Sequence, residues 1–470
     1  MTRSLLLGFV LLSFSLGFFK MSEYHAALGF SIPDNKSSNI SEVFFKANFA
    51  SSRQHTQTHA ASEIELKDGR IRAFWFSGSR EGAADVEIHS AVFDPAHGFW
   101  GKEQSVATRE ETGQSLMRFI SKLGNPVVAR SNDGKLWLYF VTVSMGGWAG
   151  SSITAMTSDD DGETWSPARR LITSPFLNIS TLIKGAPFLY SDGTVGLPVY
   201  HEFINKFCEI LHFDKTGKLI DEQRLSAGKD HGLQPIILPQ SEKKALVLMR
   251  HTGDEHRKLI GVSTEDGGKN WTVPVKLGVL NPDAAVSAVI LPDGHILAVL
   301  NNAEQGRDAL SLMVSSDNGT SWENIVQLED QHNQITDEIH YLKTVKELAG
   351  NVTSSDVDEH VRSSESSMCI DNHCRFEFSY PYLIQVKGGD FHLVYTWNRS
   401  FIKHIWFSQS WLNLQLNGHG KSAALNSETG DARFPLPSLP TVSEKLLAGH
   451  PEEGGRISLR EFHVKSLPHG

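Results

Sequence analysis

A short motif recurs along the chain at nearly constant spacing. Two segments match S-x-D-x-G-x-x-W in full, SDDDGETW at 158–165 and SSDNGTSW at 315–322, and a third at 264–271 differs only in starting with threonine. With two looser relatives, the motif aspartates fall at 94, 160, 214, 266 and 317, with gaps of 66, 54, 52 and 51 residues. A period near fifty residues with glycine-rich turns indicates stacked units of four short β-strands, the blades of a β-propeller.

A second marker runs in phase with the first. Asp-Gly dipeptides at 68, 133, 192 and 293 are each followed by an apolar run. Asp-Gly between two strand patterns is a strong hairpin signal, because both central positions of the turn tolerate positive φ. The segments LPQSEKKALVLM and VKGGDFHLVYTW fill the two remaining places in the series. Six hairpins predict an all-β, six-bladed propeller over residues 45–415.

Two regions depart from the strand pattern. Residues 330–372, before the last blade, form a polar insertion in which ITDEIHYLKTVKELAG predicts a helix. A long insertion at a blade rim is more often a lid or decoration than part of the core. From residue 416 the strand alternation stops, and residues 416–470 are predicted to be an irregular C-terminal tail.

The N-terminus carries an apolar segment. About fifteen apolar residues follow Arg3, which is short for a membrane span and the right size for the apolar region of a signal peptide. Residues 1–22 are therefore predicted to be a signal peptide, with an uncleaved N-terminal membrane anchor as the alternative. Either predicts an exported chain, whether secreted, periplasmic or anchored and facing outward.

The net charge and the cysteines limit the classes of function that the chain can have. The net charge of −10, without a run of Lys or Arg, argues against a nucleic-acid partner. Of the three cysteines, Cys369 and Cys374 are close enough to close a small disulfide in an oxidising compartment, which would leave Cys208 unpaired. No motif has the ligand count or spacing of a metal site, and none implies an organic cofactor.

The S-x-D-x-G-x-x-W element is the Asp-box, and with six blades the chain resembles the sialidase (neuraminidase) superfamily of BNR/Asp-box repeat proteins over about residues 45–415. The resemblance implies that this chain has the active site of that family. There, three arginines bind the substrate carboxylate, a tyrosine paired with a glutamate attacks the anomeric carbon, and an aspartate is the acid/base. A bidentate guanidinium matches a carboxylate, and a neutral tyrosine avoids placing a negative nucleophile against a negatively charged sugar. The Asp-boxes themselves are interpreted as fold-making turns.

Matching segments transfer these roles to individual positions. LQPIILPQSEKKALVLMR ends on the second arginine, Arg250, and Arg307 precedes an Asp-box strand as expected of the third. FEFSYPYLIQ places Tyr380 in the nucleophile role. In SGSREGAADVEI, Arg80 and Asp85 match a further arginine and the acid/base.

Two positions depart from the family pattern. His59 stands where the first arginine of the triad is expected, and Gln234 stands where the family has the glutamate that assists the tyrosine. Glu202 and the neighbouring His201 follow a strand near the axis and are the alternative bases. The tyrosine therefore lacks its usual partner in this sequence.

Three more residues are candidates for binding the substrate. Asn125 lies in a segment that resembles a loop at a blade's inner end. Arg399 and His404, in YTWNRSFIKH, either face the axis and complete the anion site or lie in surface salt bridges.

The sequence thus predicts a carbohydrate-active enzyme acting on acidic oligo- or polysaccharides. The first hypothesis is a sialidase-like exo-glycosidase that hydrolyses a terminal acidic sugar. The second is a polysaccharide lyase acting on uronate-containing chains, in which a neutral His or Tyr removes the proton beside the carboxylate and Arg or Gln neutralises the enolate. The third is a propeller that binds glycans without catalysis.

Overall fold

The computed structural model describes residues 2–23, 29–32, 42–51, 57–173, 180–203, 205–225, 232–253, 257–331, 335–349, 362 and 364–425. The chain divides into a compact unit over Met1–Gly420 and a second unit over Lys421–Gly470. Of the second unit, only residues 421–425, the end of helix α5 (Gln409–Leu425), are described.

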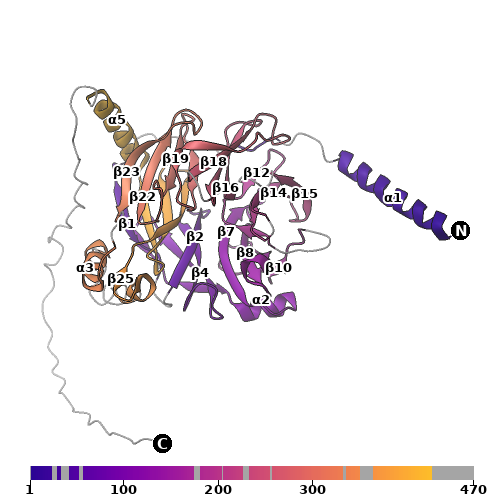
Figure 1. Ribbon diagram of the computed structural model, residues 1–470, viewed down its shortest axis with the longest axis horizontal. Helices are drawn as coiled ribbons and strands as arrows, with labels where there is room; N and C mark the ends of the chain where they lie inside the picture. Colours follow the sequence, from indigo (N-terminus) through magenta and orange to yellow (C-terminus); the bar gives the residue numbers. More distant parts are fainter. Residues whose placement is uncertain are drawn as a thin grey trace, which may run out of the picture. The chain divides into compact units, whose positions relative to one another are not determined.

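Six antiparallel sheets form the blades of the predicted propeller (Figure 1). Blade 1 contains β2 (Gln57–Glu65), β3 (Ile71–Gly78), β4 (Glu87–Asp94), β5 (Phe99–Trp100) and β6 (Gln104–Ala107). Blade 2 contains β7 (Lys122–Arg130), β8 (Leu136–Val143), β9 (Ser151–Ser158) and β10 (Arg169–Arg170). Blade 3 contains β11 (Leu182–Ile183), β12 (Phe188–Leu189), β13 (Val195–His201), β14 (Phe207–Phe213) and β15 (Leu219–Arg224).

The remaining blades follow the same order. Blade 4 contains β16 (Gly232–Pro239), β17 (Ala245–His251), β18 (Lys258–Thr264) and β19 (Val275–Leu280). Blade 5 contains β20 (Ser287–Ile290), β21 (Ile296–Leu300), β22 (Ala309–Ser315) and β23 (Glu323–Asp330). Blade 6 contains β26 (Phe378–Gln385), β27 (Phe391–Trp397), β28 (Phe401–Phe407) and β1 (Phe45–Phe49). The first strands of neighbouring blades contact one another, which places them nearest the axis.

Blade 6 is closed by a strand from the other end of the chain. Strand β1 pairs antiparallel with β28, from Phe45 opposite Phe407 to Phe49 opposite Lys403. The ring is therefore fastened by hydrogen bonds between segments more than 350 residues apart in sequence. This pairing joins the start of the propeller to its last blade.

The Asp-boxes are turns between the third and fourth strands of a blade, as predicted. In the box after β9, Ser158 Oγ donates to Asp160 Oδ1 (2.7 Å) and accepts from Gly162 N (2.8 Å), while Trp165 Nε1 donates to Gly162 O (3.0 Å). Gly162 has φ +92°, a conformation that a side chain would strain. Lys67, in the Asp-Gly turn of blade 1, donates its backbone N–H to Asp161 of this box (2.9 Å). Both kinds of turn thus lie at one end of the propeller.

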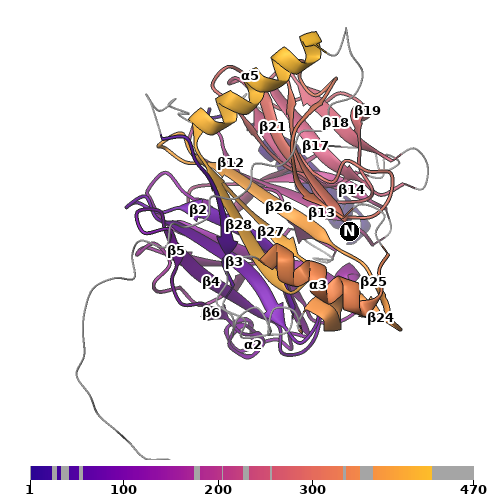
Figure 2. The same cartoon turned by 90° about the vertical axis from the view of Figure 1, so that its left-hand side faces the viewer.

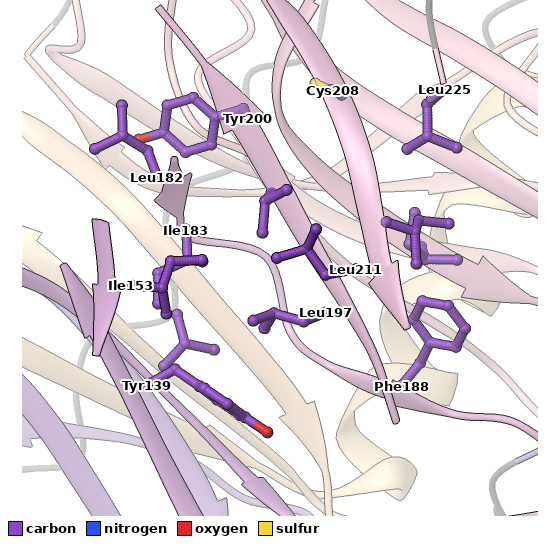
Figure 3. Packing of buried hydrophobic residues seen from close by; sticks show 14 of the residues in the cluster. Tyr139, Ile153, Leu182, Ile183, Phe188, Leu197, Tyr200, Cys208, Leu211 and Leu225 are labelled. Atoms are coloured by element: carbon purple, nitrogen blue, oxygen red, sulfur yellow. The ribbon is translucent and has the colours of Figure 1, made fainter. Parts of the chain in front are cut away.

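Apolar side chains on the strands fill the space between blades. The largest cluster joins blades 2, 3 and 4 and includes Tyr139, Leu197 and Leu211 (Figure 3). The strands are rich in Val, Ile, Leu and aromatic residues, which suit a pleated surface buried on both faces. Packing between blades holds each first strand rigidly at the axis.

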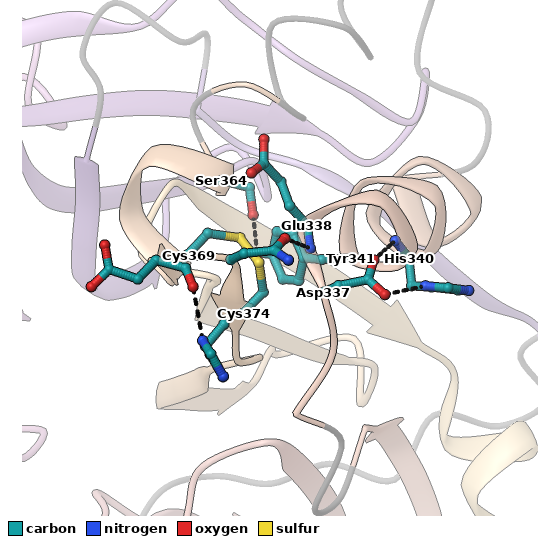
Figure 4. The surroundings of a disulfide bond; sticks show 10 residues. Asp337, Glu338, His340, Tyr341, Ser364, Cys369 and Cys374 are labelled. Atoms are coloured by element: carbon teal, nitrogen blue, oxygen red, sulfur yellow. Dashed lines mark hydrogen bonds and ion pairs between the residues drawn. A yellow bond between two sulfur atoms is a disulfide. The ribbon is translucent and has the colours of Figure 1, made fainter.

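The insertion between blades 5 and 6 contains the predicted helix, α3 (Glu338–Ala349), and a small hairpin of β24 (Cys369–Ile370) and β25 (His373–Cys374). Cys369 and Cys374 form a disulfide across that hairpin (Figure 4), and Cys208 is free and buried. Tyr341 anchors α3, because it is fully buried and its hydroxyl lies 2.5 Å from Ser364 Oγ. The insertion enters and leaves at the end of the propeller opposite the Asp-boxes.

Further helical segments lie outside the blades. Helix α1 spans Thr2–Glu23, α2 (Arg109–Leu116) precedes β7, and the short 3-10 helix η1 covers Gly147–Gly150. Helix α5 follows β28 (Figure 2). The prediction of an irregular tail from residue 416 is therefore wrong for residues 416–425, which are helical, and residues 426–470 lie outside the described residues. No helix among the described residues has the length and hydropathy needed to cross a membrane.

Candidate active site at the propeller axis

Every blade has a strained residue at the start of its first strand, at the end opposite the Asp-boxes. A non-glycine residue with positive φ lies in or just before the first strand of every blade: Ala60, Asn125, Ser180, Gln234, Asp283 and Tyr380. In blades 1, 2, 4 and 6 it lies where the register of the first two strands shifts. Such conformations cost about 1–3 kcal/mol each and cluster at functional sites. The register shifts, typical of β-bulges, re-aim side chains at the axis.

Tyr380 is the centre of the candidate site. It begins the shifted segment of β26 with φ +55°, and the Arg307 guanidinium carbon lies 5.7 Å from the centre of its ring. Arg250 and Arg399 both interact electrostatically with the Tyr380 oxygen. Guanidiniums from blades 4, 5 and 6 therefore influence one tyrosine, and that of Arg307 faces its ring.

Two carboxylates hold the arginines in place. Arg250 Nε donates to Asp283 Oδ1 (2.5 Å), and Arg307 Nη2 donates to the Asp283 carbonyl oxygen (2.7 Å). Glu377 binds Arg399 Nε (2.7 Å) and lies 3.5 Å from Arg307 Nη1. Burial opposes the charge of Glu377, but Arg399 and Arg307 outweigh it and lower the pKa of this carboxyl to about 2. The Glu377 carboxyl is therefore ionised at neutral pH.

Burial also opposes the positive charge of Arg250. The neighbouring Tyr380 oxygen and the Asp283 carboxylate outweigh that effect, and they hold the pKa of Arg250 above its usual value. Its Nη1 donates to Gln234 Oε1 (3.3 Å). Gln234 therefore takes part in orienting this arginine, a role that its amide oxygen can fill without a charge.

A second tyrosine lies beside the first. The Tyr200 hydroxyl accepts from Asn125 Nδ2 and from Gln234 Nε2, each at 3.4 Å. Tyr200 is buried (3% exposed) under the rim of blade 3, and Figure 3 shows its ring beside Leu182. Burial raises the pKa of Tyr200, and the nearby Tyr380 oxygen adds to the shift. Its hydroxyl therefore keeps its proton at neutral pH.

His59 packs against Tyr380 and is uncharged. The two rings meet edge to face at 4.5 Å between centroids. Burial lowers the pKa of His59 to about 3, although nearby Glu377 opposes the shift. His59 therefore supplies no positive charge in place of the missing family arginine at neutral pH. The third guanidinium of the cluster comes from Arg399.

The predicted acid/base and the alternative base lie at the rim. Asp85 is exposed in the loop between β3 and β4, where its carboxylate accepts from Ser79 N (3.0 Å) and Ser79 Oγ (2.9 Å). Arg80 is exposed in the same loop. Glu202 lies after β13, and partial desolvation raises its pKa while Arg250 opposes that shift.

Two predicted residues do not join the cluster. His201 follows Tyr200 on β13 and therefore projects to the opposite side, where Nε2 lies 2.9 Å from Glu209 Oε2 and the ring stacks on Phe207. His404 is fully buried between blades 6 and 1, with Nε2 3.0 Å from His392 Nδ1. In both cases the side chain lies on a face of its strand that does not reach the cluster.

The cluster also contains residues that the sequence reasoning missed, namely Tyr200, Asp283 and Glu377. The sequence does indicate where the first strands bulge, because proline inside a strand is typical of a β-bulge. Such prolines occur in Asn125-Pro126, Gln234-Pro235 and Tyr380-Pro381. Glu377 lies three residues before Tyr380, and Asp283 directly follows Pro282 in the segment before β20. Their pairing with arginines depends on contacts between blades.

Among the described residues, no group of three or more His, Cys, Asp or Glu is placed to hold a metal ion. Two surface cavities lie elsewhere: one of 380 Å³ beside the Asp-box Trp165, and one of 590 Å³ between Trp322 and helix α5. The candidate site is defined by its charged side chains.

The fold and its turns define the chain as an Asp-box β-propeller. Residues 69–393 match the family model described as the BNR repeat-like domain, and the chain belongs to that family. No curated protein matches the chain.

Solved structures with the same fold are distant in sequence. The sialidase Hz136, described as a Hadza microbial sialidase, is 14% identical with a TM-score of 0.56; the match covers 76% of this chain and 66% of that one, just under two thirds. The NanB sialidase from Streptococcus pneumoniae is 11% identical (TM-score 0.56, 81% and 72% covered). The intramolecular trans-sialidase from Ruminococcus gnavus is 12% identical (TM-score 0.55, 80% and 99% covered). At these identities the likeness establishes the fold alone.

Proposed function

We propose that the chain is a carbohydrate-active enzyme that removes a terminal acidic sugar from glycans by sialidase-type hydrolysis. The observation that carries the proposal is a cluster of three arginines, Arg250, Arg307 and Arg399, which Asp283 and Glu377 link to one another and whose Arg307 faces the Tyr380 ring. Guanidiniums bind carboxylates through paired, charge-assisted hydrogen bonds, and the same cations stabilise a developing phenolate. One constellation thus serves both substrate binding and nucleophile activation.

In this reaction the Tyr380 oxygen attacks the anomeric carbon as the bond to the leaving oxygen breaks. Asp85 protonates the leaving oxygen and then deprotonates the water that hydrolyses the glycosyl-tyrosine. Glu202 receives the phenol proton, and desolvation raises the pKa of its carboxyl, which favours proton uptake.

A lyase is the second candidate, and the contact between His59 and Tyr380 favours it. With Gln234 where a glutamate is expected, Tyr380 beside an uncharged imidazole is left to remove the proton beside a uronate carboxylate. The arginines would neutralise the enolate. The bond to the leaving oxygen would then break as a carbon–carbon double bond forms, and the proton would leave on that oxygen.

Digestion of sialylated and uronate-rich glycans, with product masses as the readout, tests the proposal. Hydrolysis is expected to release a free acidic sugar and to add one water across the cleaved bond. Products without that water, with the absorbance of an unsaturated uronate, would instead establish the lyase. Retention of intact oligosaccharide without any product would leave only the glycan-binding role.

We also infer that the chain is exported. Disulfides persist in oxidising compartments, and the Cys369–Cys374 bond joins the apolar N-terminal segment in supporting this. An acidic glycan outside the cytoplasm is the corresponding partner. We propose that the apolar N-terminal segment acts as a signal peptide.

A further inference from the structure

A buried lysine links two blades of the propeller beneath the candidate site. Lys184 follows β11 in blade 3 and is 2% exposed. Its Nζ donates to the carbonyl oxygen of Ala61 on β2 of blade 1 (3.1 Å) and lies 5.0 Å from the ring centre of Tyr382 on β26. Blades 1 and 3 are separated by blade 2, so this bond links two blades that are not consecutive.

The carbonyl that Lys184 binds belongs to the shifted segment that presents His59. The register of β2 shifts between His59 and Ser62, and Ala60 has φ +54°. The Ala60 N–H donates to Thr396 Oγ1 on β27 (3.0 Å). The segment is therefore held from two sides, by blade 6 at Ala60 and by blade 3 at Ala61.

The residue after Lys184 contacts the equivalent segment of blade 4. A Cβ atom on Gly185 would lie 2.0 Å from the carbonyl oxygen of Pro235, which directly follows Gln234 in the shifted part of β16. Only glycine permits so close an approach between two backbones. The dipeptide Lys184-Gly185 thus touches both the segment that orients His59 and the one that orients Gln234.

Burial of the Lys184 ammonium also lowers the stability of the fold. Burial lowers the pKa of Lys184 to about 7, because the surroundings disfavour the ammonium. Buried charges of this kind reduce stability, whereas an apolar side chain of similar size does not. A residue that costs stability and contacts the site is expected to serve activity.

We propose that Lys184 is a positioning residue that fixes the shifted segment of β2, and through it the contact of His59 with Tyr380. It does not contact the reacting atoms. The effect on catalysis rests on the proposed function, whereas the effect on the β2 segment does not. A displacement of about 1 Å at a catalytic group can cost up to about a hundredfold in rate.

The test compares the wild type with Lys184→Met, Lys184→Arg and Thr396→Val. Lys184→Met is expected to accelerate amide hydrogen exchange in residues 57–65 about tenfold and to lower kcat at least about tenfold, with KM and Tm little changed. Lys184→Arg, which keeps a donor, is expected to restore most of both. Thr396→Val removes the other anchor and is expected to reproduce the loss without altering the lysine.

Lys403→Met is the control, because Lys403 is a partly buried lysine paired with the buried Glu329 away from the site. It is expected to lower Tm and to leave kcat and exchange in residues 57–65 unchanged. The proposal is overturned if Lys184→Met leaves that exchange unchanged, or if it changes Tm alone as Lys403→Met does. Should the wild type turn over no sialylated or uronate-rich glycan, the proposed function fails and the exchange comparison alone decides the role of Lys184.

Discussion

Replacement of Tyr380 by phenylalanine is expected to lower kcat for release of a terminal acidic sugar by at least about a thousandfold. The substitution removes only the hydroxyl, so the edge-to-face contact with His59 and the position of Arg307 over the ring are kept. Substrate affinity should change little, because the guanidiniums stay in place. The measurement is steady-state kinetics on a sialyl substrate, together with Tm.

The control for this variant is Tyr341→Phe, which removes a buried hydroxyl that contacts Ser364 in the insertion. It is expected to cost about 1 kcal/mol of stability or less, with kcat unchanged. If Tyr380→Phe turns over substrate at the wild-type rate, Tyr380 has no place in the mechanism. Loss of activity in both variants would point to folding rather than to chemistry.

Replacement of Arg250 by methionine is expected to lower kcat/KM by about a hundredfold or more, mainly through KM. A charge-assisted hydrogen bond contributes about 1.5–3 kcal/mol, and a guanidinium offers a carboxylate two of them. Arg250 is 13% exposed and is already oriented by Asp283 and Gln234, so little ordering is needed when a substrate binds. The measurement is kinetics on the same substrate, with thermal unfolding in parallel.

Arg250→Lys separates binding from folding, because it keeps a positive charge beside Asp283 but loses the forked geometry. Its KM is expected to lie between those of the wild type and Arg250→Met. Arg224→Met serves as the matched control, since Arg224 pairs with Glu209 on the outside of blade 3. An unchanged KM in Arg250→Met would remove this arginine from substrate binding.

The blades were predictable from sequence because their signals are local. The hydrogen bonds of an Asp-box join residues at most four apart, from Ser158 to Gly162, so one short motif specifies one turn. The spacing between successive Asp-boxes then gives the number of blades. The closing of the ring was not predictable in this way, because β1 and β28 carry no shared motif and meet only through long-range pairing.

The site was less predictable because register decides which side chains reach the axis. Tyr200 and His201 are adjacent, and a strand sends them to opposite sides, so a choice between them needs the pairing and not the composition. The uncharged state of His59 and the anionic state of Glu377 depend on burial and on arginines from other blades. No spacing rule in one sequence encodes those contacts.

The central claim is that Tyr380 attacks an acidic sugar held by arginines. A ring-fluorinated N-acetylneuraminic acid that carries fluoride at the anomeric carbon tests it most directly, because the fluoride leaves readily and the ring fluorine slows hydrolysis of the covalent intermediate. Peptide mass mapping is predicted to find one fluorinated sugar on Tyr380 of the wild type and none on Tyr380→Phe. Turnover of sialylated glycans by a wild-type protein that acquires no adduct on Tyr380 would contradict the claim.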